Sequence, residues 1–337
     1  MIMKSNAIIL NKYPQSLPHE SDVDFVQIKI GSYYPDSILI RLLFLSVDPY
    51  MRNRLRPEGT KYIKPLEIGL PIVSMGIGEI IESESDKFKR GDIVVGMLPW
   101  QEYAILNPNT VKHIRQNNMP VTTQLGILGY PGLTAYVGIC KIAKPVSDQT
   151  IFISAAAGAV GSLAGQLAKI QGCYVVGSTS STKKIDYLIN NCHYDAVFNY
   201  HQYQNDYISA LNKYCSRGID IDFENVGGML MEAAIECLNQ NSTIVLCGAI
   251  SQYNEQDPRQ GPKNFYKLNA KNAKLVGYIV TDYDHLFDEF QQFVIKNYKE
   301  GKITYHETII KGLKNSWPAF IGLFEGKNIG KMIVDIT

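Results

Sequence analysis

The sequence predicts an α/β protein with two domains, one built on a doubly wound parallel sheet and one that is mostly antiparallel and barrel-like. Three observations support this prediction. The 337 residues exceed the usual size of a single hydrophobic core. Up to about residue 120, short alternating stretches are separated by Pro and Gly, which is typical of antiparallel strands. Beyond that point, apolar strands alternate with segments mostly long enough for crossover helices.

Strand-like stretches in the first part and at the end of the chain define the predicted domains. The first part has such stretches at residues 26–30, 38–45, 76–81 and 93–97. Residues 331–336 are also strand-like, and no helix follows them. We expect this last strand to return to the first domain instead of extending the parallel sheet. The predicted domains are therefore residues 1–122 for the first, 123–295 for the second, which holds the parallel sheet, and 296–337 returning to the first.

Six apolar segments of the central part are the expected parallel strands, at residues 151–154, 174–177, 196–199, 219–224, 243–247 and 274–279. The first of them runs into a turn of small residues and then into a helix expected over 162–171. Ala156, Gly158 and Gly161 occupy the three glycine positions of the G-x-G-x-x-G pattern. In this pattern the first residue makes the turn, the second admits a pyrophosphate and the third packs the helix against the strand.

The strand before this turn and the helix after it favour a Rossmann dinucleotide site, although similar turns occur in sheets that bind nothing. The N–H groups at the start of the helix would face the anion. The expected pyrophosphate contacts are Ala157, Gly158, Ala159, Val160 and Gly161.

The end of the second parallel strand favours NADP over NAD. An NAD site usually carries Asp or Glu about 20 residues after the glycine turn, where it holds the ribose hydroxyls. Residues 178–184 contain Ser, Thr, Lys183 and Lys184, and no acid. Positive charge here would pair with a 2′-phosphate, so we expect contacts from Ser180 and Lys184. The alternative is that these lysines only cover a solvated helix face.

Composition argues against several other classes of protein. Lys and Arg number 33 against 32 Asp and Glu, so there is no basic excess for nucleic-acid binding. The six cysteines lack C-x-x-C pairing and are expected to be reduced core residues. No run of about 18 apolar residues occurs, and the apolar segment at the start is too short for a signal peptide. We therefore expect a cytoplasmic enzyme with no membrane partner.

The chain resembles the zinc-free medium-chain dehydrogenases/reductases. Within that superfamily it is similar to the NADP-dependent alkenal double-bond reductases, which include the prostaglandin reductases and curcumin reductase. The matching segments run in order through nearly the whole chain: VDPYMR at 47–52, FKRGDIVVG at 88–96, GLTAY at 132–136, AAAGAVG at 155–161, FNY at 198–200, ENVGG at 224–228, CGAIS at 247–251 and NIGK at 328–331. Glu224 stands where this family usually has aspartate, and Ser180 where glycine is frequent. The resemblance implies that the antiparallel domain is GroES-like and catalytic.

No metal site is expected. The zinc alcohol dehydrogenases of this superfamily use a Cys near the start, a Gly-His-Glu segment and a later Cys. Here the first cysteine is Cys140, and the six histidines form no such cluster. The remaining chemistry is hydride transfer to an electron-poor carbon, with hydrogen-bond donors stabilising the resulting oxyanion.

The resemblance implies reduction of the C=C bond of α,β-unsaturated ketones or aldehydes. NADPH would deliver hydride to the β-carbon, and the enolate would then be protonated. The proton source stays open, because tyrosine at its ordinary pKa is a poor acid at neutral pH and water could serve. A quinone reductase of the same superfamily is the alternative, and a non-catalytic NADPH sensor is a third possibility. The expected partners are a small enone or enal and a second copy of the chain in a homodimer.

By resemblance, two tyrosines would serve the reaction. Tyr253 would touch the nicotinamide ribose, whose 2′-hydroxyl faces the substrate carbonyl. Tyr50 would line the substrate pocket as a second phenol. Each could instead simply pack, as most buried tyrosines do, and the chain has 21 of them.

The remaining cofactor contacts are also implied by the resemblance. Asn225 would bond the nicotinamide ribose, or would only cap the turn that follows it. Lys184 and Tyr200 would hold the 2′-phosphate and the adenosine end. Asn328 would reach the pyrophosphate from the tail, unless it only makes a turn. Beside the nicotinamide and its amide we expect Cys247, Gly248, Ala249, Ile250, Ser251 and the backbone of Tyr278, Ile279 and Val280.

Overall fold

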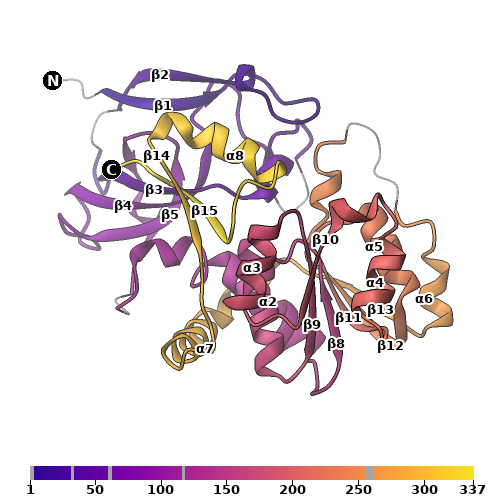
Figure 1. Ribbon diagram of the computed structural model, residues 1–337. Coiled ribbons are helices and arrows are strands. Elements are labelled where there is room, and N and C mark those ends of the chain that lie inside the picture. The colour runs from indigo at the N-terminus through magenta and orange to yellow at the C-terminus, as the bar shows by residue number, and fades with distance from the viewer. Residues whose placement is uncertain (1–3, 32–33, 60–62, 116–117, 256–260) are drawn as a thin grey trace. The chain divides into compact units, whose positions relative to one another are not determined.

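The chain divides into two compact units in the computed structural model, which describes residues 4–31, 34–59, 63–115, 118–255 and 261–337. Unit 1 comprises Met1–Leu125 with Glu307–Thr337, and unit 2 comprises Gly126–His306 (Figure 1). The sequence predicts these boundaries after residues 122 and 295. Unit 2 extends to His306 because Gln166 holds Thr304 by two hydrogen bonds, of 3.0 Å to its carbonyl and 2.7 Å from its N–H.

Unit 1 is mostly antiparallel, as the sequence predicts. Its central strand β3 pairs antiparallel with β4, β6 and the C-terminal strand β15, which confirms that the tail returns to this part of the fold. The strand β14 pairs parallel with β15, and β1 with β2 forms a separate antiparallel pair. The elements of unit 1 are β1 (Lys4–Leu10), η1 (Glu20–Asp22), β2 (Val23–Lys29), β3 (Ile38–Ser46), η2 (Pro49–Arg54), β4 (Val73–Ser83), β5 (Ile93–Pro99), β6 (Tyr103–Leu106), η3 (Pro108–Thr110), β7 (Val111–His113), η4 (Val121–Leu125), β14 (Glu307–Lys311), η9 (Leu313–Asn315), α8 (Ser316–Phe324) and β15 (Lys331–Asp335).

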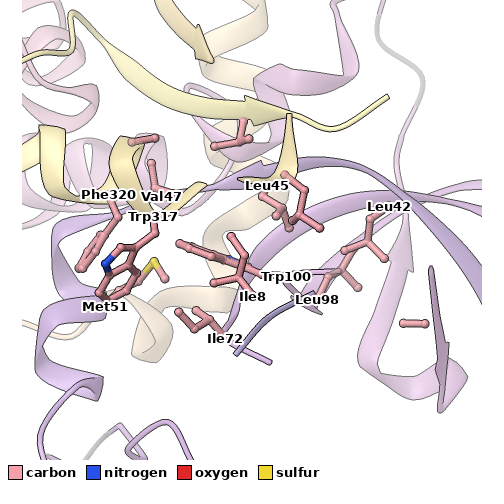
Figure 2. Close-up of a cluster of buried hydrophobic side chains, with 14 of the residues drawn as sticks. Ile8, Leu42, Leu45, Val47, Met51, Ile72, Leu98, Trp100, Trp317 and Phe320 are labelled. Carbon is pink, nitrogen blue, oxygen red and sulfur yellow. The ribbon is translucent and has the colours of Figure 1, made fainter. Parts of the chain in front are cut away.

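Two tryptophans organise the core of unit 1. Trp100 and Trp317 lie edge to face with ring centroids 6.4 Å apart, and Trp317 of α8 also packs on Phe320. Figure 2 shows these rings beside Met51 of η2. Both indole N–H groups are satisfied, since Trp100 donates to Ser74 and Trp317 to the carbonyl of His19. The core thus holds η2, which carries Tyr50, against the C-terminal helix.

Unit 2 contains a six-stranded parallel sheet in the order β10-β9-β8-β11-β12-β13, which confirms the predicted Rossmann arrangement. Helices α2 and α3 cover one face and α4 and α5 the other (Figure 1). The strand order reverses between β8 and β11. Ligands of such sheets bind outside the carboxyl ends of the strands at this reversal.

The elements of unit 2 match the predicted order, with shifted ends. The helix after the small-residue turn begins at Ala159 instead of 162, and β13 ends at Gly277 instead of 279. The elements are α1 (Tyr130–Tyr136), η5 (Val137–Ala143), β8 (Thr150–Ile153), α2 (Ala159–Ile170), β9 (Tyr174–Thr179), α3 (Thr182–Asn190), β10 (Ala196–Asn199), η6 (Tyr200–Tyr203), α4 (Tyr207–Tyr214), β11 (Ile219–Glu224), α5 (Gly228–Glu236), β12 (Leu238–Leu246), η7 (Ile250–Gln252), α6 (Tyr266–Ala270), β13 (Lys274–Gly277), η8 (Val280–Leu286) and α7 (Phe287–Lys299). Among the described residues, no helix combines the length and apolarity needed to cross a bilayer.

Strand β11 carries two fully buried carboxyl groups, Asp222 and Glu224. The register sets Asp222 opposite Phe152 of β8 and Ile244 of β12, on a face covered by apolar side chains. No described group forms a hydrogen bond with either Asp222 oxygen. Burial raises the pKa of Asp222 well above its ordinary value, and the neighbouring Glu224 charge raises it further.

The Asp222→Asn variant is expected to gain stability relative to the wild type as the pH rises. An aspartate with a raised folded-state pKa ionises first in the unfolded chain. Above the ordinary pKa, the wild type therefore loses up to about 1.4 kcal/mol of stability per pH unit until the folded-state pKa is passed. Asparagine does not titrate. Unfolding midpoints of both proteins at about pH 4.5, 6 and 7.5 measure the effect. A difference between the two midpoints that stays constant with pH would contradict a raised pKa.

Candidate active site

The turn between β8 and α2 leaves the start of the helix open for an anion. Gly158 is the N-cap of α2, and within the described chain no side chain caps this helix end. The N–H groups of the first helical turn therefore face outward with the positive end of the helix dipole. A hydrogen bond of 3.0 Å from Ala156 N–H to the carbonyl of Ser178 ties the turn to β9. This geometry suits a phosphate group.

The three positions of the glycine pattern differ in the room around them. A Cβ added at Gly161 would lie 2.7 Å from the carbonyl oxygen of Ala155, so this glycine allows the helix to pack on the strand. A Cβ added at Gly158 would meet only that same oxygen, at 3.4 Å, which leaves space for a ligand. The pattern assigns the turn to Ala156, but the left-handed residue is Ala155, with φ of 49°. Ala156 is instead a packing position, because its Cβ lies against Gly177.

The carboxyl ends of β9 and β10 form the expected adenosine end of the site. Lys184 is only 9% exposed and donates a 3.2 Å hydrogen bond to the Ser180 hydroxyl. Burial lowers the pKa of Lys184. The solvated-face interpretation is therefore wrong for Lys184. Tyr200 directly follows β10, whose Asn199 pairs with Thr179 of β9, so Tyr200 and Ser180 lie at the same sheet edge.

The ends of β8 and β11 are joined by side-chain hydrogen bonds. Asn225 donates from its amide to the carbonyl of Ser154 and from its N–H to the Ser154 hydroxyl, both at 2.7 Å. Glu224 Oε1 accepts from the Ser154 hydroxyl and from the N–H groups of Val226 and Gly227. Glu224 therefore caps the turn after β11, and the interpretation of Asn225 as the cap of this turn is wrong.

The loop after β12 lies on the turn after β11. Cys247 and Gly248 donate their N–H groups to the carbonyl of Glu224 at 2.9 and 3.1 Å. Ile250 donates to the carbonyl of Asn225 at 3.0 Å, and the Ser251 hydroxyl donates to the carbonyl of Val226 at 2.6 Å. The expected nicotinamide segment from Cys247 to Ser251 is thus held next to Asn225.

The Tyr253 phenol folds back over this loop. Its oxygen accepts a 3.4 Å hydrogen bond from Ala249 N–H. A Cβ added at Gly248 would lie 2.9 Å from the same oxygen, so glycine at this position makes room for the phenol. The Tyr253 hydroxyl is therefore held at the segment where the nicotinamide is expected.

Tyr278 directs its side chain into unit 2. Its hydroxyl donates to the carbonyl of Thr134 at 2.9 Å. Burial raises the pKa of Cys247 to about 12. Because β13 ends at Gly277, residues from Tyr278 to Val280 lie beyond the sheet hydrogen bonds. A main-chain contact of Tyr278, Ile279 and Val280 with the nicotinamide amide stays a prediction.

In unit 1, a buried lysine fixes the segment that precedes Tyr50. Lys331 Nζ donates to the carbonyl of Val47 at 2.8 Å and pairs with Asp48 Oδ1 at 2.9 Å. Ser46 donates to the other Asp48 oxygen. Burial lowers the pKa of Lys331, and the charge of Asp48 opposes this shift. The matching segments 47–52 and 328–331 are thus in contact.

Asn328, which the sequence analysis expects at the pyrophosphate, also belongs to unit 1. Its amide donates a 2.8 Å hydrogen bond to the carbonyl of Gly330. The side chain therefore supports its own turn in this structure. Tyr50 and Asn328 lie in unit 1, whereas the other expected site residues lie in unit 2.

Sequence reasoning missed Ser154 and missed the capping role of Glu224. The available signal was that each of these polar residues ends or follows an apolar strand, at the edge where Rossmann ligands bind. No group of three or more His, Cys, Asp or Glu in the described part of the chain could hold a metal ion.

Comparison with known proteins covers the whole chain. Residues 6–114 match a family model described as the N-terminal domain of oxidoreductase, and residues 159–300 match one described as zinc-binding dehydrogenase. The chain is 40% identical to a 2-alkenal reductase (NADP(+)-dependent) of Nicotiana tabacum, over 99% of this chain and 98% of that protein. It is 34% identical to the NADPH-dependent curcumin reductase of Escherichia coli, over 98% and 96% of the two chains. The crystal structure of CurA from Vibrio vulnificus in complex with NADPH superposes with a TM-score of 0.92 at 35% identity, covering 98% of this chain and 99% of that one.

Proposed function

Because the chain belongs to the alkenal, prostaglandin and curcumin reductase family of the medium-chain dehydrogenases/reductases, we propose that it reduces the C=C bond of α,β-unsaturated ketones and aldehydes with NADPH. The observation that carries this proposal is the joined set of loops after β8, β11 and β12, with the Tyr253 hydroxyl held over the last of them. Relatives named for alkenal and curcumin reduction support the substrate class.

The residues of unit 2 fit a bound NADPH. The uncapped start of α2 and the open space at Gly158 suit the pyrophosphate. Buried Lys184, next to Ser180 and the sheet edge with Tyr200, suits the 2′-phosphate, whose charge would stabilise an ammonium group that burial disfavours. Asn225 would hold the nicotinamide ribose.

NADPH, when bound, supplies the hydride that adds to the β-carbon of the substrate. Negative charge then develops on the carbonyl oxygen, and a proton adds to the α-carbon. Tyr253 would orient the nicotinamide ribose toward that oxygen, and Tyr50 would line the substrate side. Hydrogen-bond donors already in place stabilise such a charge without reorganisation.

We also infer that the chain forms a homodimer. Strand β13 is an edge of the parallel sheet, and its Leu275 is exposed. An exposed apolar edge strand can pair with a second copy of itself. Light scattering of the purified protein tests this inference, and a monomer at micromolar concentration would contradict it.

A panel of enals, enones and benzoquinones, assayed for NADPH consumption, tests the reaction. We expect turnover with enals and enones, with products that keep the carbonyl and lack the C=C bond by NMR. Faster turnover of the quinones would favour a quinone reductase instead. Tight NADPH binding without turnover of either class would favour a sensor.

The cofactor preference depends on Lys184. We expect the wild type to favour NADPH over NADH by at least about tenfold in kcat/KM, or roughly 1.4 kcal/mol. Lys184→Ala should remove most of this preference by raising the KM for NADPH, with little effect on NADH. The exposed neighbour Lys183 provides the matched control. An equal loss in Lys183→Ala would show that general surface charge sets the preference.

The Tyr253→Phe variant tests the chemical step. Removing one oxyanion donor costs about 2.7–4 kcal/mol in well-studied sites, but here the ribose hydroxyl remains. We therefore expect kcat with an enone and saturating NADPH to fall roughly tenfold to a hundredfold, while NADPH binding changes little. Tyr266, which is 71% exposed, provides the control Tyr266→Phe. Unchanged turnover in Tyr253→Phe would show that this tyrosine only packs.

A further inference from the structure

The Glu224 side chain is the meeting point of the loops that follow β8 and β11. Its Oε1 accepts hydrogen bonds from Ser154 Oγ at 2.7 Å, from Gly227 N–H at 2.9 Å and from Val226 N–H. The side chain is fully buried. Ser154 directly precedes the Ala155–Gly161 turn, and Val226 and Gly227 lead into α5. One oxygen atom thus sets the spacing between two loops.

The main chain of Glu224 extends the same link to a third loop. Its carbonyl accepts the N–H groups of Cys247 and Gly248, the first residues after β12. Asn225, the next residue, bonds Ser154 on one side and Ile250 on the other. The loops joined in this way are those that the proposed function assigns to the pyrophosphate, the nicotinamide ribose and the nicotinamide ring.

We propose that Glu224 is a positioning residue that sets the distance between the pyrophosphate turn and the nicotinamide loop. This inference rests on the proposed binding of NADPH, but not on the identity of the substrate. Glu224 acts through Ser154, Asn225 and the Cys247–Gly248 backbone. By fixing this distance, Glu224 allows the two loops to bind both halves of the dinucleotide at the same time.

The role depends on the reach of the side chain more than on its charge. Burial raises the pKa of Glu224, while the hydrogen bonds from Gly227, Ser154 and Val226 lower it. An amide oxygen at the same place could accept the same three bonds, while the amide NH2 would take the place of Oε2, which is buried and has no hydrogen-bond partner among the described residues. An aspartate, which the resemblance implies at this position in most relatives, would be one methylene too short to reach the same donors across the loop spacing of this chain. Without an acceptor, three buried donors would be left unsatisfied, and such donors are costly.

Four variants test this inference: Glu224→Gln, Glu224→Asp, Glu224→Ala and the matched control Asp222→Asn. Asp222 is an equally buried carboxyl on the same strand, and it has no hydrogen bond to the loops among the described residues. Titration calorimetry gives the Kd of each protein for NADPH and for adenosine 2′-phosphate. The second ligand carries only the end expected near Lys184 and Tyr200.

We expect Glu224→Ala and Glu224→Asp to bind NADPH about tenfold to a hundredfold more weakly than the wild type. Asp222→Asn should stay within about threefold of the wild type, and Glu224→Gln should bind NADPH more tightly than Glu224→Ala. All four should bind adenosine 2′-phosphate like the wild type, because the ends of β9 and β10 do not depend on Glu224. If Glu224→Ala fails to fold, Glu224→Asp and Ser154→Ala carry the test.

Three results would overturn the inference. Wild-type NADPH affinity in both Glu224→Asp and Ser154→Ala would show that the link does not position the cofactor. Equal weakening of adenosine 2′-phosphate would show a general structural loss. NADPH binding by Glu224→Gln as weak as that by Glu224→Ala would show that an acceptor oxygen of this reach is not what positions the loops. If the wild type itself does not bind NADPH, the proposed function fails instead, so the two failures are distinguishable.

Discussion

The parallel pairing of β8 with β11 is the constraint on which the site in unit 2 depends. Parallel strands end at the same edge of a sheet, so the residues after each strand meet there. At this edge the chain places Ser154 and Glu224, and their hydrogen bond joins two loops that are about 70 residues apart in the sequence. The uncapped helix N-terminus, the Asn225 amide and the Tyr253 hydroxyl are all arranged around this pair of strand ends.

Burial of polar groups is the physical means by which these loops are held. A buried carboxyl such as Glu224 must find donors, because leaving either partner unsatisfied is costly. The donors available are the N–H groups of a turn that has no other cap, so the turn and the carboxyl fix one another. Asp222 shows the contrast, since it is buried on the same strand without such partners and its pKa is raised.

In unit 1, a buried cation holds a loop through hydrogen bonds in the same way. Lys331 is buried among the carbonyls of Val47 and Met332 and pairs with Asp48, so the segment that leads into Tyr50 is anchored to the last strand of the chain. The tryptophan pair and α8 pack around the other side of η2. The C-terminal strand therefore stabilises the position of a segment almost 300 residues earlier in the sequence.

The sequence by itself determined the alternation of strands and helices, the glycine turn and the acid-free end of β9, because these depend on local periodicity and on the conformations that small residues allow. Only the tertiary structure decided which side chains are buried and which residues distant in the chain are in contact. In the structure, the left-handed residue is Ala155 instead of Ala156. Lys184 is buried while Lys183 is exposed. The side chain that caps the turn after β11 is Glu224 instead of Asn225. It also joined Lys331 to Asp48. Such contacts link residues far apart in the chain, and a single sequence carries no signal for which buried polar group will satisfy which distant partner.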